Sequence, residues 1–117
     1  MWTLNQFKEA NINNDLLVTA SILTKRGLSV FAPVHKDGAV TLSQALALAF
    51  GASKRYPSDG FSENLNRIPP FNRRRFIMCW DAIELEVEND IDSWAADVGQ
   101  EEVIRRITAL AKIIELS

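Results

Sequence analysis

The chain has 117 residues, of which 47% are hydrophobic and 24% are charged, and its formal net charge is −2. This length is typical of one domain, and this apolar content is enough for a hydrophobic core, which excludes a disordered tail. There is no apolar run of membrane-spanning length, and the only cysteine, Cys79, cannot form an internal disulfide. The first residues lack the basic and apolar regions of a signal peptide, so none is expected. We therefore expect a single compact domain over residues 1–117 of a cytoplasmic protein, or of a host-cell protein if its source is a virus or another mobile element.

The first part of the chain is predicted to form two helices. Thr3 and Gln6 have the spacing of a capping box, so a short helix is expected over 4–10. Asn13 is a favourable N-cap for a second helix over 14–26, which has an acidic first turn and a basic last turn. A glycine follows this second helix, as is typical of a helix C-terminus.

A small β-hairpin is expected at about 29–41. Residues 29–34 are rich in apolar side chains, and Asp37-Gly38 is a strong turn signal before a short returning strand. A lone hairpin is only marginally stable, so this one is expected to pack against the helices.

A third helix and a long basic loop are expected next. Thr41 and Gln44 repeat the capping-box spacing and predict a helix over 42–50. Residues 52–71 contain three prolines and no clean period, so they are predicted to form a loop with at most one helical turn at 62–65. Loops of this length within a compact domain are often functional.

The clearest periodic signal lies between residues 72 and 97 and predicts one long helix. Apolar residues recur there in steps of three or four: Phe76, Trp80, Ile83, Val87, Ile91, Trp94 and Val98. The strict alternation over 83–88 also fits a strand, and a break near Asn89-Asp90 would give two shorter helices. We favour the single helix, because the apolar stripe continues on both sides of the alternating segment and glutamate is a good helix former.

A last helix over about 101–116 completes the predicted fold. Its buried stripe consists of Val103, Ile107, Leu110 and Ile114. The expected fold class is mainly α (α+β), with four to five helices packed around a long central helix at about 72–97 and one small β-hairpin at about 29–41.

Charge is distributed unevenly along the chain. Residues 54–75 carry a net charge of +4 and residues 76–102 carry −9, whereas the segments before and after them carry +1 and +2. Such asymmetry is typical of proteins that meet charged partners.

Four acidic residues would lie on one face of the long helix: Asp81, Glu84, Glu88 and Asp92. Like-charge pairs four residues apart, such as Glu84–Glu88, each cost about 0.2–0.5 kcal/mol, and no lysine is interleaved to offset them. A solvated outer face is the plain alternative, but a surface shaped only for solubility would mix the two signs. We therefore expect this face to bind a basic partner, which is another protein or the chain's own basic segment. Carboxylates repeated along a helix could also imitate a nucleic-acid phosphate backbone.

The basic segment gives an alternative site, for nucleic acid. Arginines interspersed with aromatic residues can bind phosphates and stack on bases. The residues concerned are Lys54, Arg55, Tyr56, Arg67, Arg73, Arg74 and Arg75. Against this interpretation, the chain is acidic overall, and these arginines could instead pair with acidic residues on neighbouring elements.

No catalytic, metal or cofactor site is predicted. His35, the only histidine, lies in the expected turn without a fixed partner, and Cys79 lies on the apolar helix, where a buried thiol is unreactive. The sequence has no Cys/His cluster for zinc and no glycine-rich phosphate loop. We therefore do not expect an enzyme.

The sequence favours a small non-enzymatic interaction protein of the inhibitor, immunity or mobile-element accessory type. It would dock its acidic helical face onto a protein partner with a basic surface, without a cofactor and without a membrane. The alternative is a nucleic-acid-binding regulator that uses residues 54–75. A homodimer is a further alternative, because the basic segment of one copy could meet the acidic segment of another.

Overall fold

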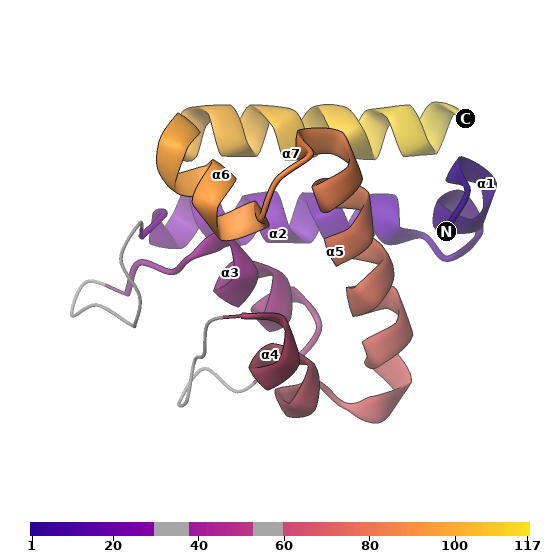
Figure 1. Cartoon of the computed structure of the whole chain (residues 1–117), viewed down its shortest axis with the longest axis horizontal. Helices are drawn as coiled ribbons and strands as arrows, with labels where there is room; N and C mark the ends of the chain where they lie inside the picture. Colours follow the sequence, from indigo (N-terminus) through magenta and orange to yellow (C-terminus); the bar gives the residue numbers. More distant parts are fainter. Residues whose placement is uncertain (30–37, 53–59) are drawn as a thin grey trace.

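The structure is a computed structural model that describes residues 1–29, 38–52 and 60–117, arranged as in Figure 1. These residues form seven α-helices and one short 3-10 helix: α1 (Leu4–Glu9), α2 (Ile12–Arg26), α3 (Leu42–Ala49), α4 (Phe61–Arg67), η1 (Pro70–Asn72), α5 (Arg73–Val87), α6 (Ile91–Val98) and α7 (Gln100–Leu116). The prediction of a mainly helical protein is confirmed. Among the residues described, no helix is both long enough and apolar enough to cross a membrane.

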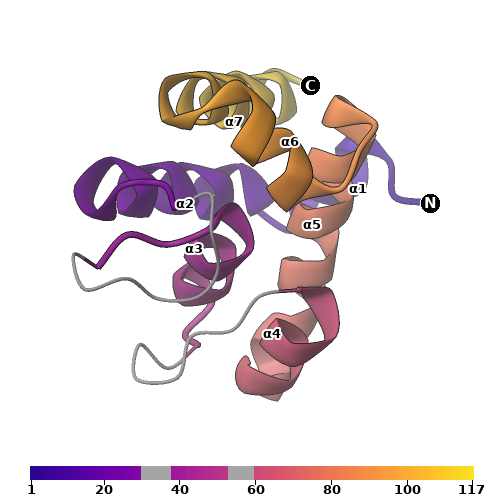
Figure 2. The ribbon, with the colours of Figure 1, turned by 60° about the vertical axis from the view of Figure 1, so that its left-hand side comes forward.

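Helices α2 and α7 form the most extensive packing pair, and α5 crosses them. Figures 1 and 2 both show α7 lying along α2, with α3 and α4 on the side of α2 away from α7. Helix α5 contacts α2, α3, α4, α6 and α7, so the first half of the predicted long helix does take a central position. The radius of gyration of 12.9 Å is that of a compact body of about this length.

The last helix agrees closely with its prediction. Helix α7 begins one residue earlier than expected, with Glu101 and Glu102 in its first turn. Its buried side contains the predicted stripe of Val103, Ile107, Leu110 and Ile114. The helical period of these apolar residues thus identified the face that packs against α2.

Both predicted capping boxes are present. The Thr3 hydroxyl accepts the Gln6 backbone N–H at 3.1 Å, and the Gln6 side-chain oxygen accepts the Thr3 N–H at 2.8 Å. Thr41 and Gln44 form the same reciprocal pair, with distances of 3.2 and 2.9 Å. These four side chains satisfy backbone donors that a helix leaves unpaired, so they fix where α1 and α3 begin.

Helix α2 begins two residues earlier than predicted. Its N-cap is Asn11, not Asn13, and Asn11 adopts a left-handed conformation with φ of 59°. Asparagine is one of the few non-glycine residues that tolerate this conformation. The earlier start places Ile12 fully inside the core, so burial of this side chain outweighs the N-cap preference of Asn13.

The single helix predicted over 72–97 is wrong, and the alternative of two shorter helices is confirmed. Helix α5 ends where Glu88 takes a left-handed conformation with φ of 54°. The Asp90 side chain then accepts a backbone N–H of the first turn of α6 at 3.0 Å and caps that helix. The alternative of a strand over 83–88 is also wrong, because residues 83–87 belong to α5.

The hairpin predicted at about 29–41 is not seen in the described part of the chain, and residues 30–37 lie outside that part. Its described ends meet in one isolated bridge of parallel type between Leu28 and Val40. The Ser29 backbone N–H donates to the Val40 carbonyl at 2.7 Å. An antiparallel ladder would be needed for a hairpin, whereas this bridge only ties the end of α2 to the start of α3.

The loop predicted over about 52–71 is wrong in its second half, and residues 53–59 lie outside the described residues. Helix α4 and the 3-10 helix η1 occupy most of that second half. Phe61 packs against the core, and Asn64 is buried and donates its side-chain N–H to the Gly60 carbonyl at 2.7 Å. The helical turn expected at 62–65 is part of α4, and the flanking prolines hid the rest of this short helix in the sequence.

Candidate functional site

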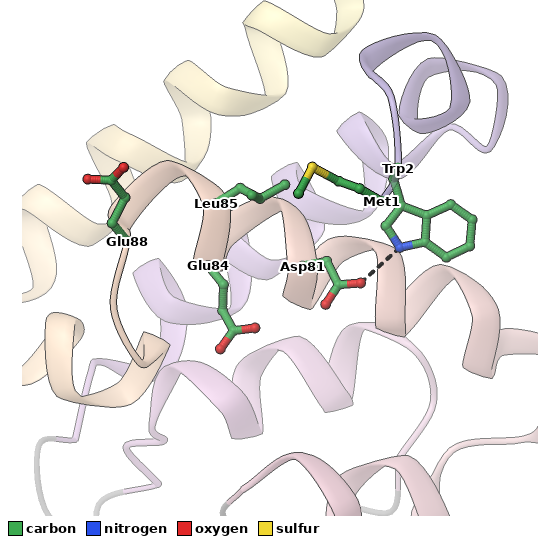
Figure 3. Close-up of a pocket in the computed structure, with 6 residues that line it drawn as sticks. All are labelled: Met1, Trp2, Asp81, Glu84, Leu85 and Glu88. Atoms are coloured by element: carbon green, nitrogen blue, oxygen red, sulfur yellow. Dashed lines mark hydrogen bonds between the residues drawn. The ribbon is translucent and has the colours of Figure 1, made fainter.

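Three of the four predicted partner-binding residues line one pocket on α5, which is shown in Figure 3. We call it the Trp2 pocket, and its volume is about 440 Å³. Its lining consists of Met1, Trp2, Asp81, Glu84, Leu85 and Glu88. Met1 and Leu85 are apolar yet 104% and 47% exposed, so the pocket has an uncovered apolar wall beside three carboxylates.

Two contacts with α5 hold Trp2 in this pocket. The indole N–H donates to the Asp81 carboxylate at 2.8 Å, as Figure 3 shows. The Arg74 guanidinium carbon lies 5.3 Å from the centroid of the same ring, a cation–π contact that typically contributes about 0.5–1 kcal/mol at an exposed site. The first two residues of the chain thereby become part of a site whose other residues lie about 80 positions later.

A second pocket adjoins the first and shares Asp81 and Glu84 with it. We call it the Phe61 pocket, and its volume is about 380 Å³. Its lining includes Phe61, Trp80, Asp81, Glu84, Asp90 and Asp92. Phe61 and Trp80 pack edge to face at 5.2 Å between ring centroids, so two aromatic rings form a firm wall.

The prediction that Asp92 lies on the same helical face as the other three acidic residues is wrong, because the turn after α5 places it on α6. There the Asp92 carboxylate accepts the Ser43 backbone N–H at 2.9 Å and joins α6 to the start of α3. The turn nevertheless directs Asp92 into the Phe61 pocket together with Asp81 and Glu84. The two pockets therefore form one acidic surface, although not the one expected.

The C-terminal end of α5 concentrates negative charge. Its last turn contains no basic residue, and Glu84 and Glu88 are four residues apart, at the end where the helix dipole is already negative. Glu86 differs, because its carboxylate lies 3.3 Å from the Arg106 guanidinium of α7. Among the described residues that line the two pockets there are five carboxylates and no lysine or arginine.

Replacing Glu88 with glycine is expected to raise the free energy of unfolding by about 1 kcal/mol. A non-glycine residue in the left-handed region is strained by roughly 1–2 kcal/mol, and the Glu88 carboxylate also lies at the negative end of the α5 dipole. Urea denaturation of the wild-type protein, Glu88→Gly and Glu88→Ala separates the two effects, because alanine removes the charge but keeps the strain. A glycine variant no more stable than the alanine variant would show that the backbone at this position is not strained.

The three consecutive arginines do not form one basic strip. Arg73 donates to the Ile68 carbonyl at 3.0 Å, and Arg74 lies over Trp2. Arg75 pairs with the Asp15 carboxylate at 3.2 Å and lies 5.4 Å from the Phe50 ring centroid. Arg75 is therefore paired with an acidic residue of a neighbouring helix, which was the expected alternative to nucleic-acid binding. Of the other residues predicted for nucleic acid, Arg67 is exposed in the last turn of α4, and Lys54, Arg55 and Tyr56 lie outside the described residues.

Asp15 of α2 and Cys79 of α5 are both buried, and the Asp15 charge acts on the Cys79 thiol. Asp15 is only 8% exposed, and burial raises the pKa of its carboxyl above the ordinary value of 3.8 although Arg75 acts in the opposite direction. Burial likewise raises the pKa of the Cys79 thiol well above its ordinary value, and the thiol lies 3.9 Å from the Ile12 carbonyl. A protonated thiol without solvent access is a poor nucleophile, in agreement with the prediction that Cys79 is buried.

The wild-type protein is expected to lose stability relative to Asp15→Asn as the pH rises. Because the pKa of Asp15 is raised in the folded state, the folded protein binds this proton more tightly than the unfolded chain does. The resulting stability is fully present below pH 3.8 and is lost as the pH rises through the raised pKa, by about 1.4 kcal/mol per pKa unit of the shift. Urea denaturation of both proteins between about pH 3 and 7 measures the difference between their free energies of unfolding. If the wild type instead gains stability relative to Asp15→Asn as the pH rises, the ion pair with Arg75 outweighs the effect of burial.

Sequence reasoning missed the residues that give the acidic surface its shape. These residues are Met1, Trp2 and Phe61, which lie outside α5. The one feature of the sequence that pointed to any of them was the position of the apolar Trp2 next to the first capping box. In the part of the chain that the structure describes, no group of three or more His, Cys, Asp or Glu residues is arranged to hold a metal ion. Comparisons of the chain with protein families, with curated proteins and with solved structures found no match.

Proposed function

We propose that this chain is a small non-enzymatic interaction protein that docks the Trp2 and Phe61 pockets onto a protein partner with a basic surface. Inhibitors, immunity proteins and the accessory proteins of mobile elements act in this way, by covering a charged surface of another protein. The observation that carries the proposal is the pair of adjoining pockets, whose described linings combine five carboxylates with apolar or aromatic walls and contain no lysine or arginine side chain.

The energetic cost of this arrangement supports a function for it. Glu84 and Glu88 both lie at the unfavourable end of the α5 dipole, and Glu88 adopts a strained conformation. A surface selected for stability alone would place lysine at these positions, since a cation is favourable at a helix C-terminus. Surfaces that lower stability in this way are common where binding requires them.

A nucleic-acid-binding regulator is the alternative, and it has less support. Arg73, Arg74 and Arg75 each contact a different part of the chain, so they do not track a phosphate backbone together. The exposed aromatic residue that best fits base stacking is Phe71, which is 82% exposed on η1. This single ring is weaker support than two adjoining acidic pockets.

Affinity capture from an extract of the source cells tests the proposal. The bait proteins are the wild type, the double reversal Glu84→Lys with Glu88→Lys, and a control reversal Glu9→Lys with Glu115→Lys, each with and without nuclease treatment. A stoichiometric basic protein that survives nuclease and is lost only with the first reversal supports the proposal. Recovery of nucleic acid, or of proteins that disappear with nuclease, would favour the alternative.

A further inference from the structure

We infer that the partner presents two cationic side chains on one segment, one for the Trp2 pocket and one for the Phe61 pocket, with Glu84 between them. This inference rests on the proposed function and specifies the chemistry of the partner. Two separate pockets share Asp81 and Glu84, and each also has carboxylates of its own: Glu88 in the first pocket, Asp90 and Asp92 in the second.

Each pocket suits a lysine or arginine side chain along its whole length. Such a side chain has an apolar stem and a charged end, so it needs an apolar wall next to a carboxylate. In the Trp2 pocket the wall is formed by the exposed Met1 and Leu85, and in the Phe61 pocket it is formed by Phe61 and Trp80. Aromatic rings favour arginine in particular, because its planar guanidinium stacks on them.

An uncharged occupant would fit poorly. An apolar segment lying over these pockets would remove carboxylates such as those of Glu84 and Glu88 from water without giving them a counter-charge, which costs several kcal/mol per buried ion. A second copy of this chain that met the surface through its own Trp2 pocket would bring three further carboxylates to it. A basic segment from a different protein therefore complements the charge better than self-association does.

Hydrogen bonds within the protein already fix three of the five carboxylates that would receive the two cations. Asp81 accepts the Trp2 indole N–H at 2.8 Å, Asp90 accepts a backbone N–H of α6 at 3.0 Å, and Asp92 accepts the Ser43 N–H at 2.9 Å. Little side-chain freedom remains to be lost on binding, which favours affinity. Two cations on one segment would also bind cooperatively, since the first raises the effective concentration of the second.

The three tryptophans of the chain allow a direct test, because the two pockets contain one each and the third lies elsewhere. Trp2 reports on the first pocket and Trp80 on the second, whereas Trp94 lies on α6 under Arg106 and serves as the reference. Capped peptides Ac-Arg-(Gly)n-Arg-NH2, with n from 0 to 4, are titrated into the ¹⁵N-labelled protein at low salt, and the three indole resonances are followed. Ac-Arg-Gly-Gly-NH2 is the single-cation control.

At the best spacing, Trp2 and Trp80 are expected to shift along one saturation curve while Trp94 does not move. The affinity should exceed that of the single-arginine peptide at least tenfold. Glu88→Gln should reduce the affinity and the Trp2 response, and Asp90→Asn should do the same for Trp80, because asparagine retains the helix cap. Each variant should leave the response of the other tryptophan in place.

Equal affinities for the one-arginine and two-arginine peptides, or a response from only one of the two tryptophans, would overturn the inference. So would an absence of any response to either peptide. If the Glu84→Lys, Glu88→Lys reversal still abolishes capture of the protein partner in that case, the proposed function stands and only the two-cation recognition fails. If both peptides bind as expected but capture is unaffected by the reversal, the proposed function fails instead.

Discussion

Reversing Glu84 and Glu88 to lysine is expected to weaken binding of the basic partner at least hundredfold, which corresponds to about 2.7 kcal/mol. Each substitution replaces an attraction with a repulsion at the centre of the acidic surface, and Glu84 belongs to both pockets. The melting temperature should not fall, because lysine at the end of α5 interacts favourably with the helix dipole. Titration calorimetry with the purified partner and thermal unfolding of the variant measure the two quantities.

The control for this prediction is the reversal of Glu9 and Glu115. Both residues are exposed and both lie in the last turn of a helix, so the dipole effect is matched. Each reversal moves the net charge of the chain from −2 to +2, so the overall electrostatic change is matched as well. If the control weakens binding as much as the test variant does, then net charge governs the interaction and the pockets do not.

Most of the helices were predictable, because the signals for them are local. A capping box needs only two residues three positions apart, and an amphipathic stripe such as that of α7 needs only the helical period. The break after α5 was predicted only as the less favoured alternative, because the apolar steps continue across it and its left-handed residue is Glu88. A glycine or proline at that position would have indicated the end of the helix.

The candidate site was only partly predictable, for a related reason. Glu84 and Glu88 could be grouped from the sequence because they are four residues apart at the C-terminal end of α5, where Glu88 is the C-cap. Trp2 and Phe61 could not, since they reach the acidic surface only through tertiary packing and no local rule relates them to it. Asp92 lines the Phe61 pocket because the chain turns between α5 and α6. Its position therefore depends on a break in the helix that was not the favoured prediction.

Replacing Phe76 with alanine is expected to lower the free energy of unfolding by about 3–5 kcal/mol, the largest effect expected for one substitution in this chain. Phe76 is fully buried, and its ring lies 6.0 Å from Phe50, 5.9 Å from Phe61 and 5.7 Å from Trp80. The cavity left behind would remove support from the two rings that form the wall of the Phe61 pocket. Urea denaturation measures the loss of stability, and the Trp80 indole resonance reports on the pocket.

Phe71→Ala is the matched control for this prediction, because it removes the same side chain from a site that is 82% exposed. Its effect should stay within about 0.5 kcal/mol, as for most surface substitutions. If Phe76→Ala unfolds the protein altogether, Phe76→Leu leaves a smaller cavity and should retain the fold with an intermediate loss. Equal effects of Phe71→Ala and Phe76→Ala would contradict the assignment of Phe76 to the core. They would also mean that Phe76 does not hold the aromatic wall of the Phe61 pocket in place.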